Sequence, residues 1–330
     1  MISKSMLQQF CLATAVIALS SVTLAQEPFP NRPMQMLVPF PPGGSADIMG
    51  RRYAEKFKEI LNEPVVVINR TGANGVVAWQ SMGTTKPDGH TLFMAAGQGL
   101  GYIHLMNSAV TSRFVQDFTP VASYGNYTLV ILVNKELPVT NLRELAAYAS
   151  KNPKALSYGT TGVGSGGHLK FEMYKSVANI PDASLPPVHF AGVVPELTAI
   201  VGNHIQVAIM PLTSLATQQI DAGAIRALAI TSENRSPFRK DIATVVEQGF
   251  PSLVAKDYLT IWVMSKTPQT IVDKLAAAAR RASEDRDIRK AMDDLFFESE
   301  FLDGAGARKH FETRTAELEP VIRRLNIKLQ

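Results

Sequence analysis

Cysteine is almost absent from this sequence, because the 330 residues contain only Cys11. That cysteine lies in an apolar N-terminal segment that we expect to be removed. The remaining chain would then contain no cysteine, which excludes disulfides, thiolate metal sites and cysteine nucleophiles. Long runs of apolar residues and of basic residues are absent as well. No later segment reaches the roughly 20 apolar residues that span a membrane, and no block of basic residues marks a nucleic-acid-binding protein.

The N-terminus has the layout of a secretory signal. Lys4 precedes an apolar stretch from Cys11 to Ala18, and small residues lead to Thr23-Leu24-Ala25. With about a dozen apolar residues, the segment is too short for a membrane anchor. We therefore expect a signal peptide at residues 1–25 and a soluble mature protein in the periplasm. The net charge of +4 favours anionic ligands weakly.

Short apolar runs alternate with amphipathic segments along the rest of the chain. Residues 34–40 predict a strand, 46–61 a helix, and 64–70 and 90–96 two further strands. A second series of the same kind begins at residues 127–135. Strands that alternate with helices indicate βαβ units. We therefore expect an α/β protein of two lobes, each a mixed, mostly parallel sheet flanked by helices, with a ligand cleft between the lobes.

No flexible linker marks the boundary between the two series. We expect short crossings near residues 125–130 and 240–255, with lobe 1 formed by 26–127 and 249–330 and lobe 2 by 128–248. Further strands are predicted at 155–161, 185–190, 205–210, 225–231 and 258–264. The segment from Pro268 onward is predicted to be mostly helix.

A loop rich in proline and glycine follows the first predicted strand. Gly43 and Gly44 allow the backbone to approach a ligand closely, and the N-terminus of the next helix offers free N–H groups. Ser45 either caps this helix or donates its hydroxyl. Asp47 suits the helix dipole but would repel a nearby anion. Taken alone, the loop is equally consistent with an anion site and with a tight turn.

The stretch 157–174 repeats this arrangement in the second half, with hydroxyls on Thr160, Thr161 and Ser165 among several glycines. Two such loops facing each other would hold both ends of an anionic molecule. Nucleotide-binding motifs and the nucleophile elbow are not matched. His168 is either a base for Ser165 or a polar first-turn histidine, and we favour the latter. No spacing of histidines indicates a metal site, so we expect no catalysis, no metal and no cofactor.

In their order, these segments resemble the substrate-binding receptors of tripartite tricarboxylate transporters, the Bug receptor family. The resemblance covers nearly the whole mature chain. Its markers are "PNRPMQMLVPFPPGGSADI", "PVVVINRTGANG", "KPDGHTLFMA", "DFTPVA", "YGTTGVGSGGHL", "GNHIQVAI", "GAIRALAIT" and "KTPQTIVDKL".

The resemblance implies a two-lobed fold like that of type II periplasmic binding proteins. It also implies a monomeric receptor that closes around a small carboxylate, such as a dicarboxylate or an aromatic acid, and delivers it to membrane permease subunits. The ligand-binding residues that it implies are Phe40, Gly43, Gly44, Ser45 and Asp47, then Ala96, Gly97 and Gln98, then Thr160, Thr161, Gly164, Ser165 and His168, and finally Ala191, Gly192 and Met210.

The sequence departs from the family pattern at two of these positions. Ala191 stands where relatives usually carry lysine, and Met210 lies in a segment where they often carry a polar or acidic residue. The two residues either make the cleft less polar, with room for a longer or aromatic acid, or simply pack. Two other functions stay open, namely an exported hydrolase that uses Ser165 and His168, and a sensor subunit that presents its ligand to a signalling partner.

Overall fold

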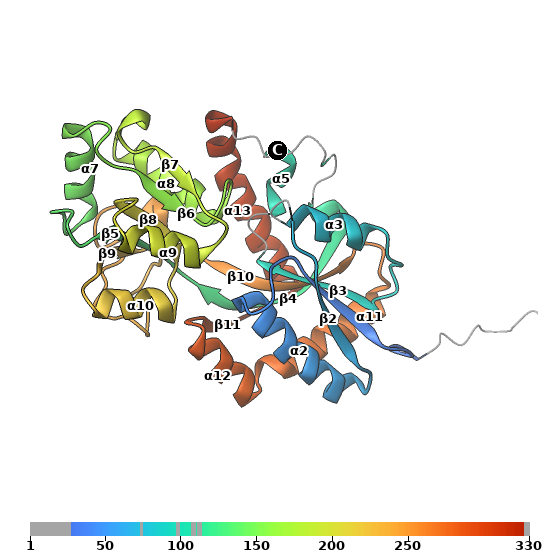
Figure 1. Cartoon of the computed structure of the whole chain (residues 1–330). Coiled ribbons are helices and arrows are strands. Elements are labelled where there is room, and N and C mark those ends of the chain that lie inside the picture. The colour runs from blue at the N-terminus through green and yellow to red at the C-terminus, as the bar shows by residue number, and fades with distance from the viewer. Residues whose placement is uncertain (1–27, 73–74, 97–99, 107–109, 111–113, 327–330) are drawn as a thin grey trace, which may run out of the picture. The chain divides into compact units, whose positions relative to one another are not determined.

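The computed structural model describes residues 28–72, 75–96, 100–106, 110 and 114–326. The expected signal peptide lies outside these residues. The described residues from 32 to 326 fold into two β-sheets, each flanked by helices (Figure 1). Within the described residues, no helix is both long enough and apolar enough to cross a membrane.

The first sheet has six strands in the order β11-β4-β10-β3-β1-β2. Its strands are β1 (Met34–Val38), β2 (Val65–Asn69), β3 (Thr91–Ala96), β4 (Phe118–Tyr127), β10 (Asp257–Met264) and β11 (Glu298–Asp303). The helices from the same parts of the chain are α2 (Ser45–Leu61), α3 (Val76–Gly83), α5 (Ile103–Met106), α6 (Phe114–Asp117), α11 (Gln269–Ser283), α12 (Arg286–Asp294) and α13 (Gly304–Leu325).

The second sheet has five strands in the order β7-β6-β8-β5-β9. Its strands are β5 (Leu129–Asn134), β6 (Tyr158–Thr160), β7 (Pro187–His189), β8 (Val207–Pro211) and β9 (Ile225–Ile230). The accompanying helices are α7 (Leu142–Lys151), α8 (Gly166–Val177), α9 (Val193–Val201) and α10 (Ser214–Asp221), with 3-10 turns η2 (Asp182–Ser184) and η3 (Pro251–Leu253).

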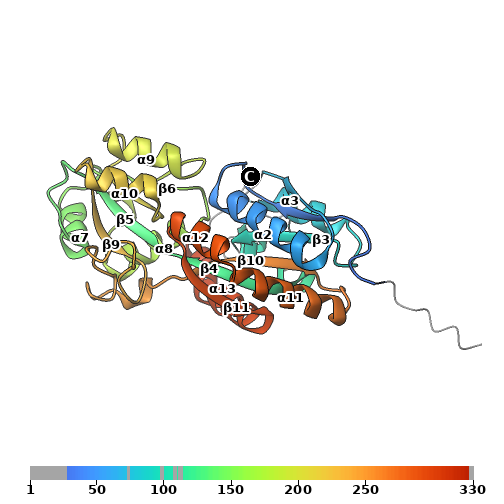
Figure 2. The same cartoon turned by 90° about the horizontal axis from the view of Figure 1, so that it is seen from below.

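Central strands such as β5, β8 and β10 are buried on both faces, and successive side chains of a strand point to opposite sides. In β8, Val207 and Ile209 join the core that α7 and α8 cover, whereas Ala208 and Met210 join the core under α9 and α10. Figure 2 shows α9 and α10 lying together on one side of this sheet. Two buried faces explain why the strands appear in the sequence as continuous apolar runs.

The expected mixed α/β architecture is confirmed, but its parallel share is smaller than expected. Strand β1 pairs in parallel with β2 and β3, and β6 pairs in parallel with β7 and β8. All the pairs that β4, β5, β10 and β11 make are antiparallel. Strands β4 and β5, and likewise β9 and β10, follow each other along the chain but belong to different sheets.

Two strands of the first sheet are absent from the sequence-based prediction. Strand β4 contains Pro120 and Gly125, two residues that are rare inside strands. Strand β11 is a short edge strand with charged residues, and it interrupts the segment after Pro268 that was expected to be mostly helical. Pairing with a neighbouring strand therefore outweighs the weak local preference of both segments.

The chain passes from the first sheet to the second at Thr128 and returns between Ile230 and Asp257. Phe250 and Val254 pack against the core of the second sheet. Residues up to Val254 thus contact the core of the second sheet, whereas the boundary between the lobes is expected at 248/249 from the sequence.

A small apolar cluster connects helices from the two parts of the chain. It contains Tyr102, Met106, Leu169, Leu318 and Ile322, which come from α5 and the residue before it, from α8 and from α13. We call it the α5–α8–α13 cluster. Leu169 and Leu318 have no exposed surface, so the C-terminal half of α13 is fixed to the helix that follows the second glycine-rich loop.

Candidate functional site

The first glycine-rich loop links β1 to α2 and leaves the start of the helix open. Gly43, Gly44 and Ser45 are exposed. Gly44 is the N-cap residue and Ser45 is the first helical residue, so of the two roles considered for Ser45, capping is not the one that the structure shows. Because Gly44 has no side chain, no side-chain hydrogen bond caps α2. The N–H groups of the first turn lack partners within a helix, and they lie at the positive end of the helix dipole.

Asp47 is buried beneath this loop and fixes its shape. Its Oδ2 accepts the N–H of Gly43 at 2.9 Å, and its Oδ1 accepts the amide of Asn69 at 2.9 Å. The same amide of Asn69 donates to the carbonyl oxygen of Phe40 at 2.9 Å. The N–H of Gly43 is therefore already bonded, and the free donors of the loop lie further on, in the first turn of α2. Gly43 itself has φ +83°, a conformation that favours glycine.

The charge of Asp47 is balanced by Arg51, one helical turn further along. Arg51 Nη2 lies 2.9 Å from Asp47 Oδ1, and Arg51 Nε donates to Oδ2 at 3.1 Å. Burial would raise the pKa of Asp47, but the hydrogen bonds from Arg51, Gly43 and Asn69, together with the charge of Arg51, bring the pKa below its ordinary value. The sequence predicts that Asp47 would repel a nearby anion, and the neighbouring cation Arg51 offsets this repulsion.

The second glycine-rich loop links β6 to α8. Ser165 is the N-cap of α8, and its Oγ accepts the main-chain N–H of His168 at 3.2 Å. Thr160 is fully buried, and its Oγ1 lies 2.7 Å from Nδ1 of His189. Thr161 and Ser165 are partly exposed. Unlike α2, this helix begins with a capped end, so the second loop offers its polar groups in a fixed arrangement.

His168 is held as a neutral ring. Its Nδ1 accepts the N–H of Gly164 at 3.0 Å, so the ring proton of the neutral form lies on Nε2. The ring of His189 lies across it, with centroids 4.6 Å apart. Burial, assisted by the neighbouring His189 and Lys175, lowers the pKa of His168 to about 3. A ligand at this loop would therefore meet a neutral donor instead of an imidazolium.

The geometry of Ser165 and His168 does not assemble a nucleophile and its base. Within this part of the described chain, no hydrogen bond joins the Ser165 hydroxyl to the His168 ring, because the ring is bonded to Gly164 and the hydroxyl to the main chain. No group of three or more metal-ligating side chains occurs among the described residues. The described geometry favours binding through neutral donors over hydrolysis.

The remaining predicted residues fall into three situations. Ala191 is exposed and Gly192 is partly exposed, in the turn that precedes α9. Met210 has no exposed surface and packs in the core under α9 and α10, so the expectation that it lines the cleft is not met in this structure. Ala96 ends β3, and Gly97 and Gln98 lie outside the described residues.

The two glycine-rich loops belong to different sheets, and no hydrogen bond or ion pair connects them among the residues that the structure describes. The second loop contacts the other part of the chain through Met106 of α5. A Cβ atom at Gly164 would come within 2.7 Å of the Met106 methyl group. The α5–α8–α13 cluster therefore extends to the second loop itself.

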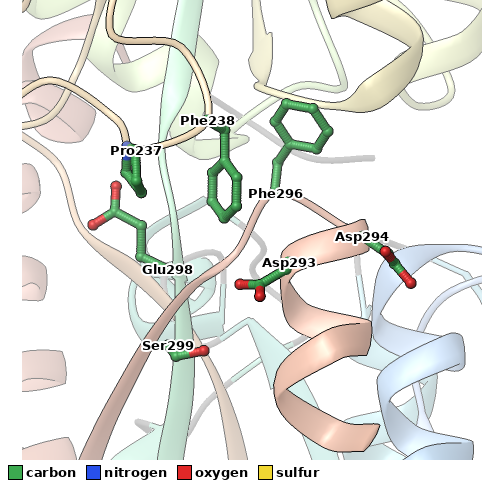
Figure 3. A pocket seen from close by; sticks show the side chains of 7 residues that line it. All are labelled: Pro237, Phe238, Asp293, Asp294, Phe296, Glu298 and Ser299. Atoms are coloured by element: carbon green, nitrogen blue, oxygen red, sulfur yellow. The ribbon is translucent and has the colours of Figure 1, made fainter. Parts of the chain in front are cut away.

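A separate pocket of about 720 Å³ lies between residues 237–238 and residues 293–299. Figure 3 shows the rings of Phe238 and Phe296 near each other, with the carboxylates of Asp293 and Glu298 around the same space. None of the residues predicted for ligand binding lines it. Its carboxylates would repel an anion, so the glycine-rich loops suit an anionic ligand better.

Several residues that shape the loops escaped the sequence-based prediction. Asn69 and Arg51 hold the first loop, His189 packs on His168, and Met106 covers Gly164. A signal existed for Asn69. It ends β2, which pairs in parallel with β1, and the carboxyl ends of parallel strands lie at one edge of a sheet.

These features define a class of protein. Two mixed sheets, joined by two chain crossings and each carrying a glycine-rich loop before a helix, have the architecture of periplasmic solute-binding proteins.

The comparisons with known proteins identify the family. The model of the family described as "Tripartite tricarboxylate transporter family receptor" matches residues 49–327, and the chain belongs to this family. Protein BugT of Bordetella pertussis is 29% identical over 281 residues, which cover 85% of this chain and 84% of BugT. The chain is thus a solute-binding receptor of the Bug type.

Two solved structures are similar over nearly their whole length. Rpa4515 of R. palustris, solved with adipate, is 26% identical with a TM-score of 0.79, covering 91% of this chain and 99% of that protein. MatC of Rhodopseudomonas palustris, solved with bound malate, is 26% identical with a TM-score of 0.76, covering 89% of this chain and 100% of MatC.

Proposed function

We propose that this receptor binds a small carboxylate in the periplasm, between the first loop (40–47) and the second loop (160–168) with the turn 191–192, and delivers it unchanged to membrane permease subunits. Residues 1–25 are the signal peptide that exports it. Lobe 1 comprises residues 26–127 and the chain from about residue 256, and lobe 2 the residues between. The ligand contacts both lobes and draws them together.

The observation that carries the proposal is the uncapped start of α2. Gly44 leaves the first-turn N–H groups without a side-chain cap, and Asp47, an acid of the same turn, forms an ion pair with Arg51. Such a helix start binds a carboxylate through its N–H groups and its dipole. The second loop adds neutral donors, among them Ser165 and His168.

Two solved relatives support a dicarboxylate as the ligand class. Adipate and malate, the molecules present in Rpa4515 and MatC, are both dicarboxylates. A dicarboxylate matches a site with one donor group in each lobe. The exposed Ala191 adds no charge to the turn before α9, which leaves room there for the carbon chain of a longer acid.

A thermal-shift screen of the chain from Gln26 tests this function. The panel contains adipate, malate, tricarboxylates, aromatic acids and amino acids, and calorimetric titration follows any hit. Ligand at 100 times Kd adds about 2.7 kcal/mol to the free energy of unfolding, a clear shift in Tm. The variant Gly44→Val, whose side chain would intrude on the first loop, serves as the non-binding control.

The same samples separate binding from catalysis. After incubation with wild-type protein, the ligand is recovered and analysed by NMR, and we expect it unchanged. Ser165→Ala should keep most of the affinity, because the main-chain donors remain. Conversion of the ligand by the wild type and its loss in Ser165→Ala would instead establish the hydrolase. No shift with any acid would contradict the proposed function.

A further inference from the structure

Three acidic side chains of the described chain are buried, and one of them has no cation beside it. Asp47 pairs with Arg51, and Glu172 pairs with Lys175 at 2.8 Å. Glu196 has 0% exposure and forms no ion pair within the described residues. It is the fourth residue of α9, the helix that follows the predicted ligand-binding turn 191–192.

The contacts of Glu196 lead to the end of the strand that carries the second loop. Its Oε1 accepts the N–H of Ile209 in β8 at 3.2 Å. Ile209 is the residue of β8 that pairs with Thr160, the last residue of β6. Gly159 in β6 passes directly over the acid, because a Cβ atom there would lie 3.1 Å from Cγ of Glu196. The acid therefore joins the start of α9 to the middle of β8 and to β6.

Among the described residues, no cationic side chain pairs with this carboxyl group to stabilise an anion. Helix α9 packs against β5, β6 and β8. On these strands and on the neighbouring β7, the titratable side chains are Tyr158, whose hydroxyl donates to Glu172, and His189, which bonds Thr160. Burial raises the pKa of Glu196 to about 9, and the hydrogen bond from Ile209 lowers it in part. At neutral pH the group is an un-ionised acid.

The second oxygen of the group supports the same interpretation. Oε2 of Glu196 is buried and has no hydrogen-bond partner among the described residues. A buried carboxylate in that position would cost far more free energy than a neutral acid, since each unpaired charge loses its hydration. Ionisation would therefore draw water toward the group or displace it from Ile209.

We propose that Glu196 is a positioning residue for ligand binding, whose un-ionised carboxyl group braces the start of α9 against β6 and β8. The brace sets the spacing between the second loop and the turn 191–192. This inference rests on the proposed function, because it assigns Glu196 a role in arranging the groups that hold the carboxylate. Glu196 acts through these segments and does not contact the ligand.

The test compares Glu196→Gln, Glu196→Ala and Glu233→Gln with the wild type. Gln keeps the shape and the acceptor of the neutral acid, Ala removes both, and Glu233 is an exposed acid of the same part of the chain. Adipate affinity is titrated between pH 6.5 and 10. One pH unit above the pKa of Glu196, about one tenth of the molecules keep the un-ionised group and remain able to bind. The affinity of the wild type for adipate should therefore fall about tenfold.

The variants should differ in a way that a purely structural role would not produce. We expect Glu196→Gln to match the wild type at neutral pH and to lose the alkaline fall, whereas Glu233→Gln retains it. Glu196→Ala should bind more weakly at every pH. Hydrogen exchange of the peptides that cover 157–168 and 205–211 should be faster in Glu196→Ala and unchanged in Glu196→Gln.

Each alternative outcome is decisive. An identical alkaline fall in the wild type and Glu196→Gln, or unchanged exchange and affinity in Glu196→Ala, would overturn the brace. If Glu196→Ala does not fold, the pH profile of Glu196→Gln decides. If the wild type does not bind adipate or any other acid of the panel, the proposed function fails, and the brace is then judged by the exchange of 157–168 alone.

Discussion

At the scale of single residues, Gly44 occupies a position where serine would serve the helix better. Its backbone is extended, as at an ordinary N-cap, and an added Cβ would meet only the carbonyl oxygen of Pro41 at 3.5 Å. Ser165 shows the alternative in the same chain, because its hydroxyl caps α8. The missing side-chain cap on α2 leaves first-turn N–H groups uncapped at a small cost in stability, and the proposed function uses them as donors to the ligand.

The substitution Gly44→Ser tests this exchange of stability for binding. The hydroxyl would cap α2 and raise the free energy of unfolding by a few tenths of a kcal/mol. It would also occupy a donor of the ligand, which should weaken binding by about tenfold (~1.5 kcal/mol). Urea unfolding and calorimetric titration measure the two effects. In the control Gly43→Ser, the positive φ should instead cost about 1–2 kcal/mol of stability. Stronger binding by Gly44→Ser would contradict the role of the open helix start.

Asp47 supports the first loop in a pH-dependent manner. In Asp47→Asn, one of the two acceptors becomes a donor that faces Gly43 or Asn69, and we expect a loss of about 1–3 kcal/mol. Because the folded pKa of Asp47 lies below its ordinary value of 3.8, the stabilisation is complete above that pH and is lost as the pH falls through the folded value. Urea unfolding of both proteins from pH 7 to 3 should show the difference shrinking only at the acid end. A difference that stays constant would exclude the ionised carboxylate as its source.

The sequence distinguishes some of these residues better than others. Gly43 and Gly44 stand out locally, since glycine after a strand is a strong signal. The role of Asp47 was ambiguous because its partner Asn69 lies in strand β2, 22 residues further along the chain. Met210, for which packing was the alternative to lining the cleft, is buried in a core. Strand β8 has two buried faces, and a uniformly apolar strand does not reveal which side faces a ligand.

At the scale of elements, α13 contacts helices α5 and α8, which are far from it in the sequence. Its C-terminal half contributes Leu318 and Ile322 to the α5–α8–α13 cluster, and Arg324 donates to Ser176 of α8 at 2.6 Å. These contacts fix the helix of the second loop to the C-terminal helix. Apolar periodicity predicts that α13 has a buried stripe, but it does not name the partner of that stripe.

The substitution Leu318→Ala tests this connection. The side chain is fully buried, so its removal should lower the free energy of unfolding by about 2–5 kcal/mol. Val177→Ala, at a side chain that is 47% exposed on α8, should change stability little. Denaturant unfolding of both variants makes the comparison. Equal effects would show that the cluster contributes nothing beyond an ordinary surface contact.

Strands β4 and β11 show why the sheet could be predicted only in part. The strands β1, β2 and β3 are apolar and flanked by turn residues, and they were predicted within two residues of their ends. Strand β4 and the charged edge strand β11 depend on antiparallel pairing with distant segments. Such pairing reflects tertiary packing, which a local pattern does not encode.

At the scale of the whole molecule, the proposed function predicts compaction on binding. A carboxylate held by donors in both lobes stabilises a closed state and shifts the population toward it. Small-angle scattering of the chain from Gln26 should show a smaller radius of gyration when the ligand found in the screen is saturating. Gly44→Val should show no such change at the same ligand concentration. Compaction of both proteins would mean that the first loop is not required for closure.

Both tryptophans of the chain lie in one core. Trp79 and Trp262 belong to the apolar cluster of the first sheet, where Trp79 donates its indole N–H to Asp117 at 2.9 Å. Indole emission therefore reports on that sheet alone, whereas far-ultraviolet circular dichroism reports on both. Coincident unfolding curves from the two probes would identify a single cooperative unit. A separation of the curves would give the stability of each half without any labelling of the protein.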